Sequence, residues 1–87
     1  MIQRLKIEPA YFEAVSSWKK TFEIRYNDRD YKVGDLLVLR EWDGEKYTGR
    51  EVDRVVSYVS HYAQQTGYVV LALWHPNPRI VLMDSQP

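Results

Sequence analysis

Turn-forming residues divide this chain into a series of short apolar runs, and this division is the strongest constraint on its fold. Clusters such as Asn27-Asp28-Arg29-Asp30 and Asp43-Gly44 are typical of turns, which end one strand and allow the next to begin. The runs that predict strands are residues 2–7, 21–26, 36–42, 46–59 and 67–74, and residues 80–83 are a candidate for a sixth strand.

One helix is expected near the N-terminus, between the first two strands. Pro9 suits the first position of a helix, where its missing N–H group is not needed. Phe12 and Val15 then place apolar side chains on one face over residues 9–17. The two serines at positions 16 and 17 weaken the helix and are expected to end it.

A small, mainly β barrel is the architecture that these elements favour. The chain has 87 residues, enough for one domain, and 45% of them are hydrophobic, as in folded globular proteins. Five or six short strands close best into a barrel, because closure removes exposed strand edges. We therefore expect an α+β fold that is mainly β, with one or two short helices, over residues 1–74. Residues 75–87 form a C-terminal extension in this interpretation.

The fourth run predicts an irregular strand. Its apolar positions step from Val52 to the adjacent pair Val55-Val56, which breaks a simple alternation. An extra residue in one strand of a pair produces such a step. The sequence therefore predicts a bulge or bend near Asp53-Arg54.

Composition argues against several classes of protein. The absence of Cys excludes disulfides and thiol nucleophiles, and in a chain this short it indicates a cytoplasmic protein. No apolar run approaches the ~20 residues that span a bilayer, so no membrane insertion is expected. His61 and His75 are far apart and lack ligand-like neighbours. We therefore expect neither a metal site nor a cofactor.

Acidic and basic residues balance, which argues against a strongly cationic nucleic-acid binder. Twelve Lys and Arg stand against twelve Asp and Glu, a formal net charge of zero. Bulk attraction to phosphates needs an excess of positive charge. Any nucleic-acid ligand is therefore expected to be short or locally bound, and not a long duplex.

The most informative stretch follows the helix and enters the second strand, at residues 19–25. The period of two of a β-strand places Thr21, Glu23 and Arg25 on one face, and Phe22, Ile24 and Tyr26 on the other. Arg25 offers a planar fork for a phosphate or a base edge, and Lys20 a flexible point charge. Glu23 offers a carboxylate that accepts hydrogen bonds or acts as a base. The alternative is a solvated strand face whose charges pair with their neighbours.

This stretch resembles the ASCH group of the PUA-like superfamily, whose signature is Gly-x-Lys-x-x-Glu-x-Arg. Lys20-x-x-Glu23-x-Arg25 matches the charged positions. The chain is most similar to the DUF3850 family, small proteins of unknown function that often come from phages and prophages. The motifs that carry this likeness are residues 19–25, 27–30, 33–35, 47–50 and 67–71. The resemblance covers roughly residues 3–74 and implies a PUA-like β-barrel with a cleft between barrel and helix.

Trp18 departs from the signature, because a glycine there would permit a tight turn after the helix. Either the helix ends in another geometry, or the Trp18 ring is a wall of the cleft; a ring that covers the barrel end is the structural alternative. Tyr26 is a candidate for stacking on a base, a contact worth about 1–3 kcal/mol, or else a rim residue. Asn27 and Arg29 are candidates for polar ligand contacts, with a turn-forming role as the alternative.

The resemblance implies binding of RNA or modified nucleosides, and for some members of the superfamily it implies hydrolysis. We therefore expect a module that binds a nucleotide or single-stranded RNA. Its predicted ligand-binding residues are Trp18, Lys20, Glu23, Arg25, Tyr26, Asn27 and Arg29. The first alternative is a small hydrolase, either an amidohydrolase on an acylated nucleoside such as N4-acetylcytidine or a ribonuclease, with Lys20 and Glu23 as catalytic residues.

A protein-interaction domain is the second alternative. Ile80, Val81 and Leu82 in the C-terminal extension are apolar residues that would suit a weak dimer contact. The binding module ranks first, the hydrolase second and the interaction domain third. The oligomeric state is open at this point.

Overall fold

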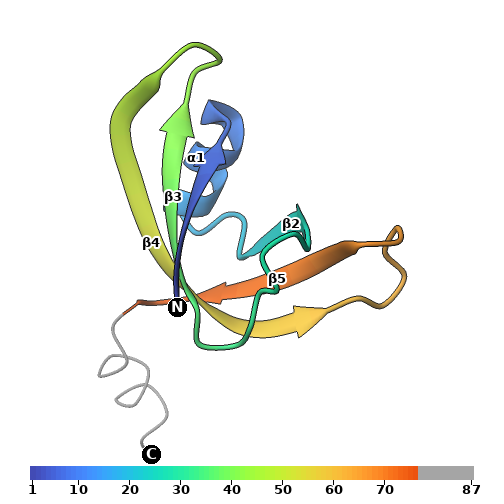
Figure 1. The fold of residues 1–87 in the computed structure, drawn as a ribbon. Coiled ribbons are helices and arrows are strands. Elements are labelled where there is room, and N and C mark those ends of the chain that lie inside the picture. Colours follow the sequence, from blue (N-terminus) through green and yellow to red (C-terminus); the bar gives the residue numbers. More distant parts are fainter. Residues whose placement is uncertain (77–87) are drawn as a thin grey trace, which may run out of the picture.

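The computed structural model describes residues 1–76, which form one helix and five strands (Figure 1). In chain order these elements are β1 (Ile2–Ile7), α1 (Pro9–Ser16), β2 (Phe22–Tyr26), β3 (Leu36–Trp42), β4 (Tyr47–Ser60) and β5 (Tyr68–Trp74). The expected small α+β fold that is mainly β is confirmed. The candidate sixth strand at residues 80–83, with the apolar residues proposed for a dimer contact, lies outside the described residues.

All five strands belong to one sheet, in the order β1-β3-β4-β5-β2. β1 pairs in parallel with β3, and every other neighbouring pair is antiparallel. The long strand β4 pairs first with β3 and then with β5, and it bends the sheet on the way (Figure 1). The result is a curled half-barrel whose edge strands are β1 and β2.

Alternation along the strands directs one face of the sheet into the curl, where the core lies. Every second residue of β3 and of β5 is buried. The helix α1 packs against this face through Phe12 and Val15, which lie on one helical side. The core residues are Leu5, Ile7, Phe12, Val15, Tyr31, Leu37, Leu39, Val56, Val69, Leu71 and Leu73.

The helix begins and ends close to the positions that the sequence predicts. Pro9 occupies the first turn, and Ser17 is the C-cap residue, whose N–H donates to Glu13 O at 3.1 Å. The Ser17 hydroxyl donates to the same carbonyl at 2.7 Å. This side chain thus forms a local hydrogen bond with the backbone where the helix ends, as expected for a serine. Within residues 1–76, no helix has the length and apolar character needed to cross a membrane.

The predicted bulge or bend of β4 lies a few residues beyond residues 53–54, where the pairing itself is regular. Residues 51–55 keep a regular register with β3, and the pairing with β5 shifts only after Val56. The reason is Arg54, which is buried and takes the inward position between Val52 and Val56. The alternation is therefore unbroken, but a cation holds a position where an apolar residue was expected.

Arginine side chains link the two free edges of the sheet. Arg29 Nη1 donates to Arg4 O at 2.9 Å, and Arg25 Nη2 donates to Lys6 O at 2.6 Å. Both acceptors are carbonyl groups of β1, so the two guanidinium groups cover part of the edge that a closed barrel would have paired. The half-barrel stays open between its edges, and the candidate site lies at this opening.

Candidate functional site

A cavity of about 620 Å³ opens between the edge strand β2 and the junction of β1 with α1. One wall consists of Lys6, Ile7, Glu8 and Tyr11, and the other of Lys20, residues 22–26 and Tyr68. Small-molecule sites typically have volumes of about 300–1,000 Å³. The cavity is therefore large enough for a small organic ligand.

Three charged side chains, Lys20, Glu23 and Arg25, meet at this cavity and are called the charged triad below. Lys20 Nζ lies 3.3 Å from Glu23 Oε1, and Arg25 Nε lies 2.9 Å from Glu23 Oε2. Glu23 is only 4% exposed, and both cations are partly buried. A buried carboxylate is stable only when its charge is paired, and here each oxygen has its own cation.

Both cations are also fixed from their outer sides. The Arg25 guanidinium donates to Lys6 O across the cavity, at 2.6 Å. Lys20 Nζ lies 4.5 Å from the centre of the Tyr11 ring and 5.2 Å from that of Phe22, which are cation–π distances. An ammonium has three N–H donors and a guanidinium five, so each cation keeps donors for an anionic ligand.

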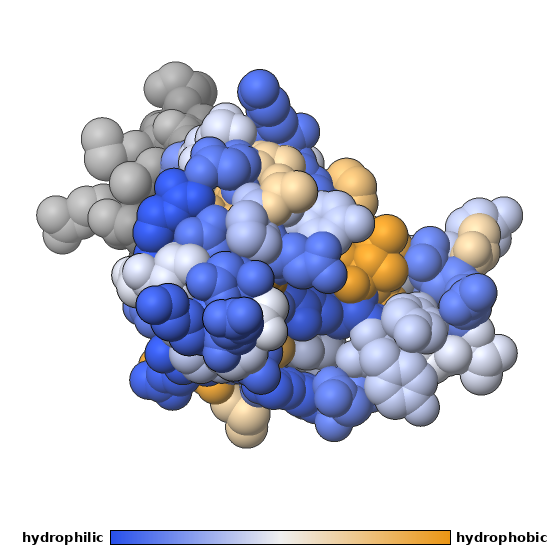
Figure 2. Space-filling view, turned by 90° about the horizontal axis from the view of Figure 1, so that it is seen from above, coloured by the Kyte–Doolittle hydropathy of each residue, from blue (hydrophilic) through white to orange (hydrophobic). Residues whose placement is uncertain are grey.

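The strand β2 turns its polar face inward and its apolar face outward. Phe22, Ile24 and Tyr26 are 40%, 49% and 58% exposed, whereas Glu23 is buried opposite Leu71 of β5. The polar row is therefore not a solvated strand face, although its charges pair with their neighbours as that interpretation expects. Glu23 tolerates the inward position because two cations neutralise it there, and the apolar residues of this edge strand reach the cavity instead of the core. Exposed hydrophobic residues are also visible from above, in orange among polar surface (Figure 2).

Aromatic rings stand around the mouth of the cavity. The Tyr26 and Tyr68 rings meet edge to face, with their centres 5.5 Å apart. Tyr11 of α1 is 52% exposed and lies on the opposite wall. A Cβ atom added to Gly67 would lie 2.6 Å from Tyr26 Cε1. The absence of a side chain at Gly67 therefore allows the Tyr26 ring to lie against the backbone.

Trp18 lies outside the cavity lining, so its ring is not a wall of the cavity, and the expectation of another geometry at the helix end is also wrong. Its φ of 65° is the left-handed conformation that a glycine would adopt, and its N–H donates to Val15 O at 3.1 Å. The helix therefore ends as a glycine would end it. The Trp18 ring does not line the cavity but packs 3.9 Å from the Arg54 guanidinium, beside Trp74 and His75. This contact offsets the strain of a left-handed Trp.

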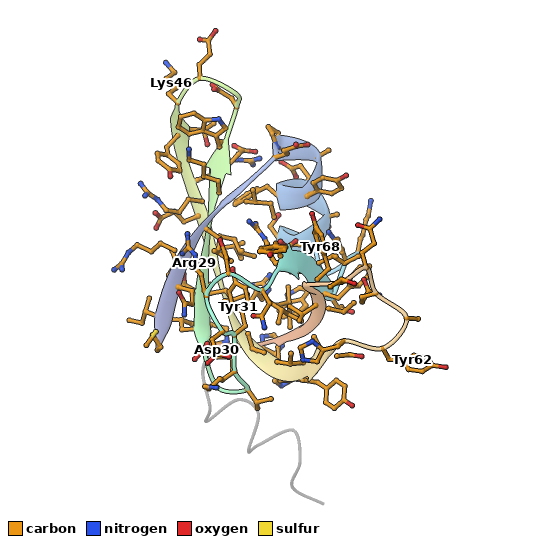
Figure 3. All side chains as sticks on the ribbon, turned by 45° about the vertical axis from the view of Figure 1, so that its right-hand side comes forward. Arg29, Asp30, Tyr31, Lys46, Tyr62 and Tyr68 are labelled. Carbon is orange, nitrogen blue, oxygen red and sulfur yellow. The ribbon has the colours of Figure 1, made fainter. Side chains whose placement is uncertain are left out.

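Asn27 and Arg29 also lie outside the cavity lining, and their hydrogen bonds are structural. Asn27 Oδ1 accepts a hydrogen bond from the Tyr31 N–H at 3.1 Å, which closes the turn after β2. Arg29 reaches β1 and donates to the carbonyl of Arg4, and Figure 3 shows it beside that strand. Of the seven predicted ligand-binding residues, the structure thus brings Lys20, Glu23, Arg25 and Tyr26 together at the cavity.

Arg54 is a buried cation that the sequence pattern did not reveal. Its Nη2 donates to Val15 O at 3.1 Å and its Nη1 to Asp53 O at 2.7 Å. Burial lowers the pKa of Arg54 from its ordinary value. The carbonyl groups at the C-terminal end of a helix nevertheless favour a cation, so Arg54 serves to hold α1 on the sheet.

A second ion-pair cluster ties the β3–β4 hairpin to α1. Arg50 donates to both oxygens of Glu41, at 3.0 and 2.8 Å, and the Thr48 hydroxyl donates to Glu41 Oε1 at 2.7 Å. Arg50 also pairs with Glu13 of α1. The hydrogen bonds from Arg50 and then Thr48 lower the pKa of Glu41 to about 2. This cluster lies outside the cavity lining, and its role is structural.

No sequence pattern revealed the residues that complete the cavity from other elements, chiefly Lys6, Tyr11 and Tyr68. Only the pairing of β2 with β5 brings Tyr68 opposite Tyr26, and only the packing of α1 brings Tyr11 over Lys20. Local alternation carries no signal for either contact. Within residues 1–76, no three His, Cys, Asp or Glu side chains are placed to hold a metal ion.

Comparison with known proteins gives a family match over most of the chain. The profile of a family described as a domain of unknown function, DUF3850, matches residues 2–73. An uncharacterized 12.9 kDa protein in the GpA 3′ region of Escherichia phage P2 is 39% identical over 59 residues. That alignment covers 68% of this chain and 54% of the phage protein, so the match spans about half the length of this relative.

Proposed function

This chain belongs to the DUF3850 family, and we propose that its cavity binds a nucleotide or a short segment of single-stranded RNA. The observation that carries the proposal is the charged triad, in which Lys20 and Arg25 are fixed around a buried Glu23 at the wall of the cavity. Aromatic rings and guanidinium groups are the means by which proteins recognise unpaired bases. Both are present at this opening.

Each part of the cavity has a role in this proposal. Lys20 and Arg25 donate their remaining N–H groups to a phosphate or to a base edge. Glu23 retains free lone pairs, because a carboxylate accepts about four hydrogen bonds, and it can accept from an exocyclic amine. Tyr26 and Tyr11 supply rings for stacking. The charged triad has two cations and one carboxylate, so one net positive charge remains there for a phosphate.

We also propose that the curled half-barrel is a variant of the PUA-like barrel of the ASCH group. The support is positional: the Lys20-x-x-Glu23-x-Arg25 motif follows a helix end and lines an opening between helix and sheet. The resemblance implies a cleft at this place. Trp18 supports the same relation, because it adopts the left-handed conformation that suits the glycine of the signature.

Hydrolysis of an acylated nucleoside is a second candidate function, favoured by the 3.3 Å contact between Lys20 Nζ and Glu23 Oε1 at the cavity. A pair at this distance can exchange a proton. An amine nucleophile must be uncharged, however, whereas Lys20 forms an ion pair with Glu23 and lies against two aromatic rings. Incubation with N4-acetylcytidine tests this function: cytidine release that is lost in Lys20→Gln supports it, and no release rejects it.

Substitution of the most exposed ring at the cavity tests the binding proposal. A labelled single-stranded RNA octamer of mixed sequence is titrated at low salt against the wild type and Tyr26→Ala. The loss of one base–aromatic stack, worth about 1–3 kcal/mol, is expected to weaken binding by about 5- to 150-fold. Tyr26 is 58% exposed, so its removal leaves the core intact.

Tyr62→Ala is the matched control. Tyr62 is 88% exposed and lies in the loop between β4 and β5, away from the cavity (Figure 3). It is expected to bind the octamer as tightly as the wild type. Equal affinities for all three proteins, or no binding by the wild type at low salt, would reject the proposal.

A further inference from the structure

The outer face of β1 and β3 carries a row of cations. Arg4 and Lys6 are exposed and alternate with the buried residues Leu5 and Ile7. The parallel register places Lys6 opposite Arg40 of β3. Two strands therefore present cations side by side on the face that points away from the core.

Arg29 joins this row from the turn after β2. Its Nη1 donates to the carbonyl of Arg4 at 2.9 Å, which fixes the guanidinium beside β1 (Figure 3). We call Arg4, Lys6, Arg29 and Arg40 the basic strip. Within the described part of the chain, Arg40 pairs with Glu51 at 3.1 Å, and the other three cations form no ion pair.

The strip has a local excess of positive charge although the whole chain has none. By the same alternation, Glu51 and Asp53 of β4 are the carboxylates that share this outer face. On the strands of this face, three cations thus stand against two carboxylates, and Arg29 adds a cation from the turn after β2. A polyanion that approached this molecule would be attracted to this face, because exposed charges act only over about one Debye length.

Aromatic rings continue the strip toward the β3–β4 hairpin. Lys6 Nζ lies 4.1 Å from the centre of the Trp42 ring, and the Arg40 guanidinium lies 3.8 Å from that of Tyr47. The Trp42 and Tyr47 rings meet edge to face, 4.9 Å apart. Cations interleaved with rings are the composition of surfaces that bind single-stranded nucleic acid, where phosphates meet the cations and bases meet the rings.

Lys6 belongs to both surfaces, because it lines the cavity and also lies over Trp42. We propose that a single-stranded RNA held in the cavity continues over Lys6 onto the outer face of β1 and β3, where the basic strip binds its phosphates. The ligand is then an oligonucleotide that occupies two connected surfaces. This inference rests on the proposed function, since it assigns a path to the RNA that leaves the cavity.

Removal of charge from the strip at Arg4 and Arg29 tests this path at residues that do not line the cavity. Arg4→Gln is the mildest variant, because the Arg4 side chain makes no hydrogen bond or ion pair with the other described residues. The double variant Arg4→Gln/Arg29→Gln removes two cations. Lys19→Gln/Lys32→Gln removes two exposed cations from outside the strip as the matched control. Each protein is titrated with the RNA octamer at several salt concentrations and with the four ribonucleoside monophosphates.

We expect Arg4→Gln to weaken octamer binding by about two- to fivefold and to reduce the salt slope by about 0.7, the value for one phosphate contact on a single strand. The double variant is expected to reduce the slope by about 1.4. Mononucleotide affinity should stay at the wild-type value in both. The lysine control should bind the octamer like the wild type.

The possible failures are distinguishable. If the double variant binds the octamer as tightly as the wild type while Tyr26→Ala binds it more weakly, the RNA path over the basic strip is rejected. The proposal that the cavity binds RNA then still stands. An equal loss in the lysine control would also reject the strip, because the effect would then reflect net charge alone. No binding of any RNA by the wild type would reject the strip and the proposed function together.

Discussion

At the scale of single residues, Trp18 shows how one position combines strain with a compensating contact. A left-handed backbone costs a residue other than glycine about 1–2 kcal/mol. Trp18 adopts this conformation, with φ of 65°, and packs on the buried guanidinium of Arg54. The same guanidinium donates to Val15 O at the end of α1. One cation therefore stabilises both the helix end and the strained residue that follows it.

Paired substitutions at Trp18 separate the strain from the contact. Trp18→Ala and Trp18→Gly both lose the ring, but only Gly relieves the left-handed backbone. The greater conformational freedom of glycine in the unfolded chain reduces the stability gained from this relief by about 0.5–1 kcal/mol. We expect Trp18→Gly to be more stable than Trp18→Ala by about 0.5–1 kcal/mol in urea unfolding followed by circular dichroism. An Ala variant as stable as the Gly variant, or more so, would show that the position is not left-handed.

At the scale of elements, β2 departs most from what its sequence suggests. A strand with alternating polar and apolar residues normally buries the apolar ones. In β2 the carboxylate of Glu23 is buried, and Ile24 is 49% exposed. The inversion is possible because β2 is an edge strand, flanked only by β5 within residues 1–76, and because Lys20 and Arg25 neutralise the buried charge. A strand that exposes its apolar residues and buries a charge in this way is often part of a ligand-binding site.

The β3–β4 hairpin is fixed to α1 by a carboxylate that titrates unusually low. The pKa of Glu41 falls from 4.5 to about 2 because Arg50, and then Thr48, donate hydrogen bonds to it. The folded state therefore binds fewer protons than the unfolded chain between these values, and the stabilisation is lost as the pH falls through this range. The hairpin is expected to loosen from the helix in acid.

Replacement of Glu41 tests this link through its pH dependence. The Glu41→Gln variant cannot titrate at this position, so its deficit in unfolding midpoint against the wild type should be full above pH 4.5 and shrink toward pH 2. Thr48→Val removes only one donor and should show a smaller deficit in the same window. Urea unfolding at a series of pH values measures both. A deficit that does not change with pH would contradict the assigned ion pair.

The elements themselves could largely be predicted from the sequence, because their signals are local. The bounds predicted for residues 36–42 agree with β3, and Pro9 marks the start of α1. The parallel pairing of β1 with β3 could not be predicted, because no local pattern encodes which distant strand becomes a neighbour. Arg54 was missed for a related reason: its burial depends on the end of α1, which lies far away in sequence.

At the scale of the whole molecule, the incomplete closure of the sheet creates the candidate site. A closed barrel would have paired β1 with β2 and filled the opening. Here arginine side chains bridge the two edges, and the cavity of about 620 Å³ remains between β2 and the β1–α1 junction. The motif Lys20-x-x-Glu23-x-Arg25 identified one wall of this cavity. The opposite wall could not be predicted, because it depends on the packing of α1 and the curl of the sheet.

Amide shift mapping by two-dimensional ¹H–¹⁵N NMR, with the RNA octamer titrated into the wild-type chain, tests the central claim most directly. The claim is that the opening between the sheet edges, lined by the charged triad, binds RNA. We predict that the largest shift changes fall in residues 6–8 and 20–26, the two sides of the cavity. Changes confined to the cluster of Trp18, Trp74 and His75, or no changes at saturating RNA, would contradict it.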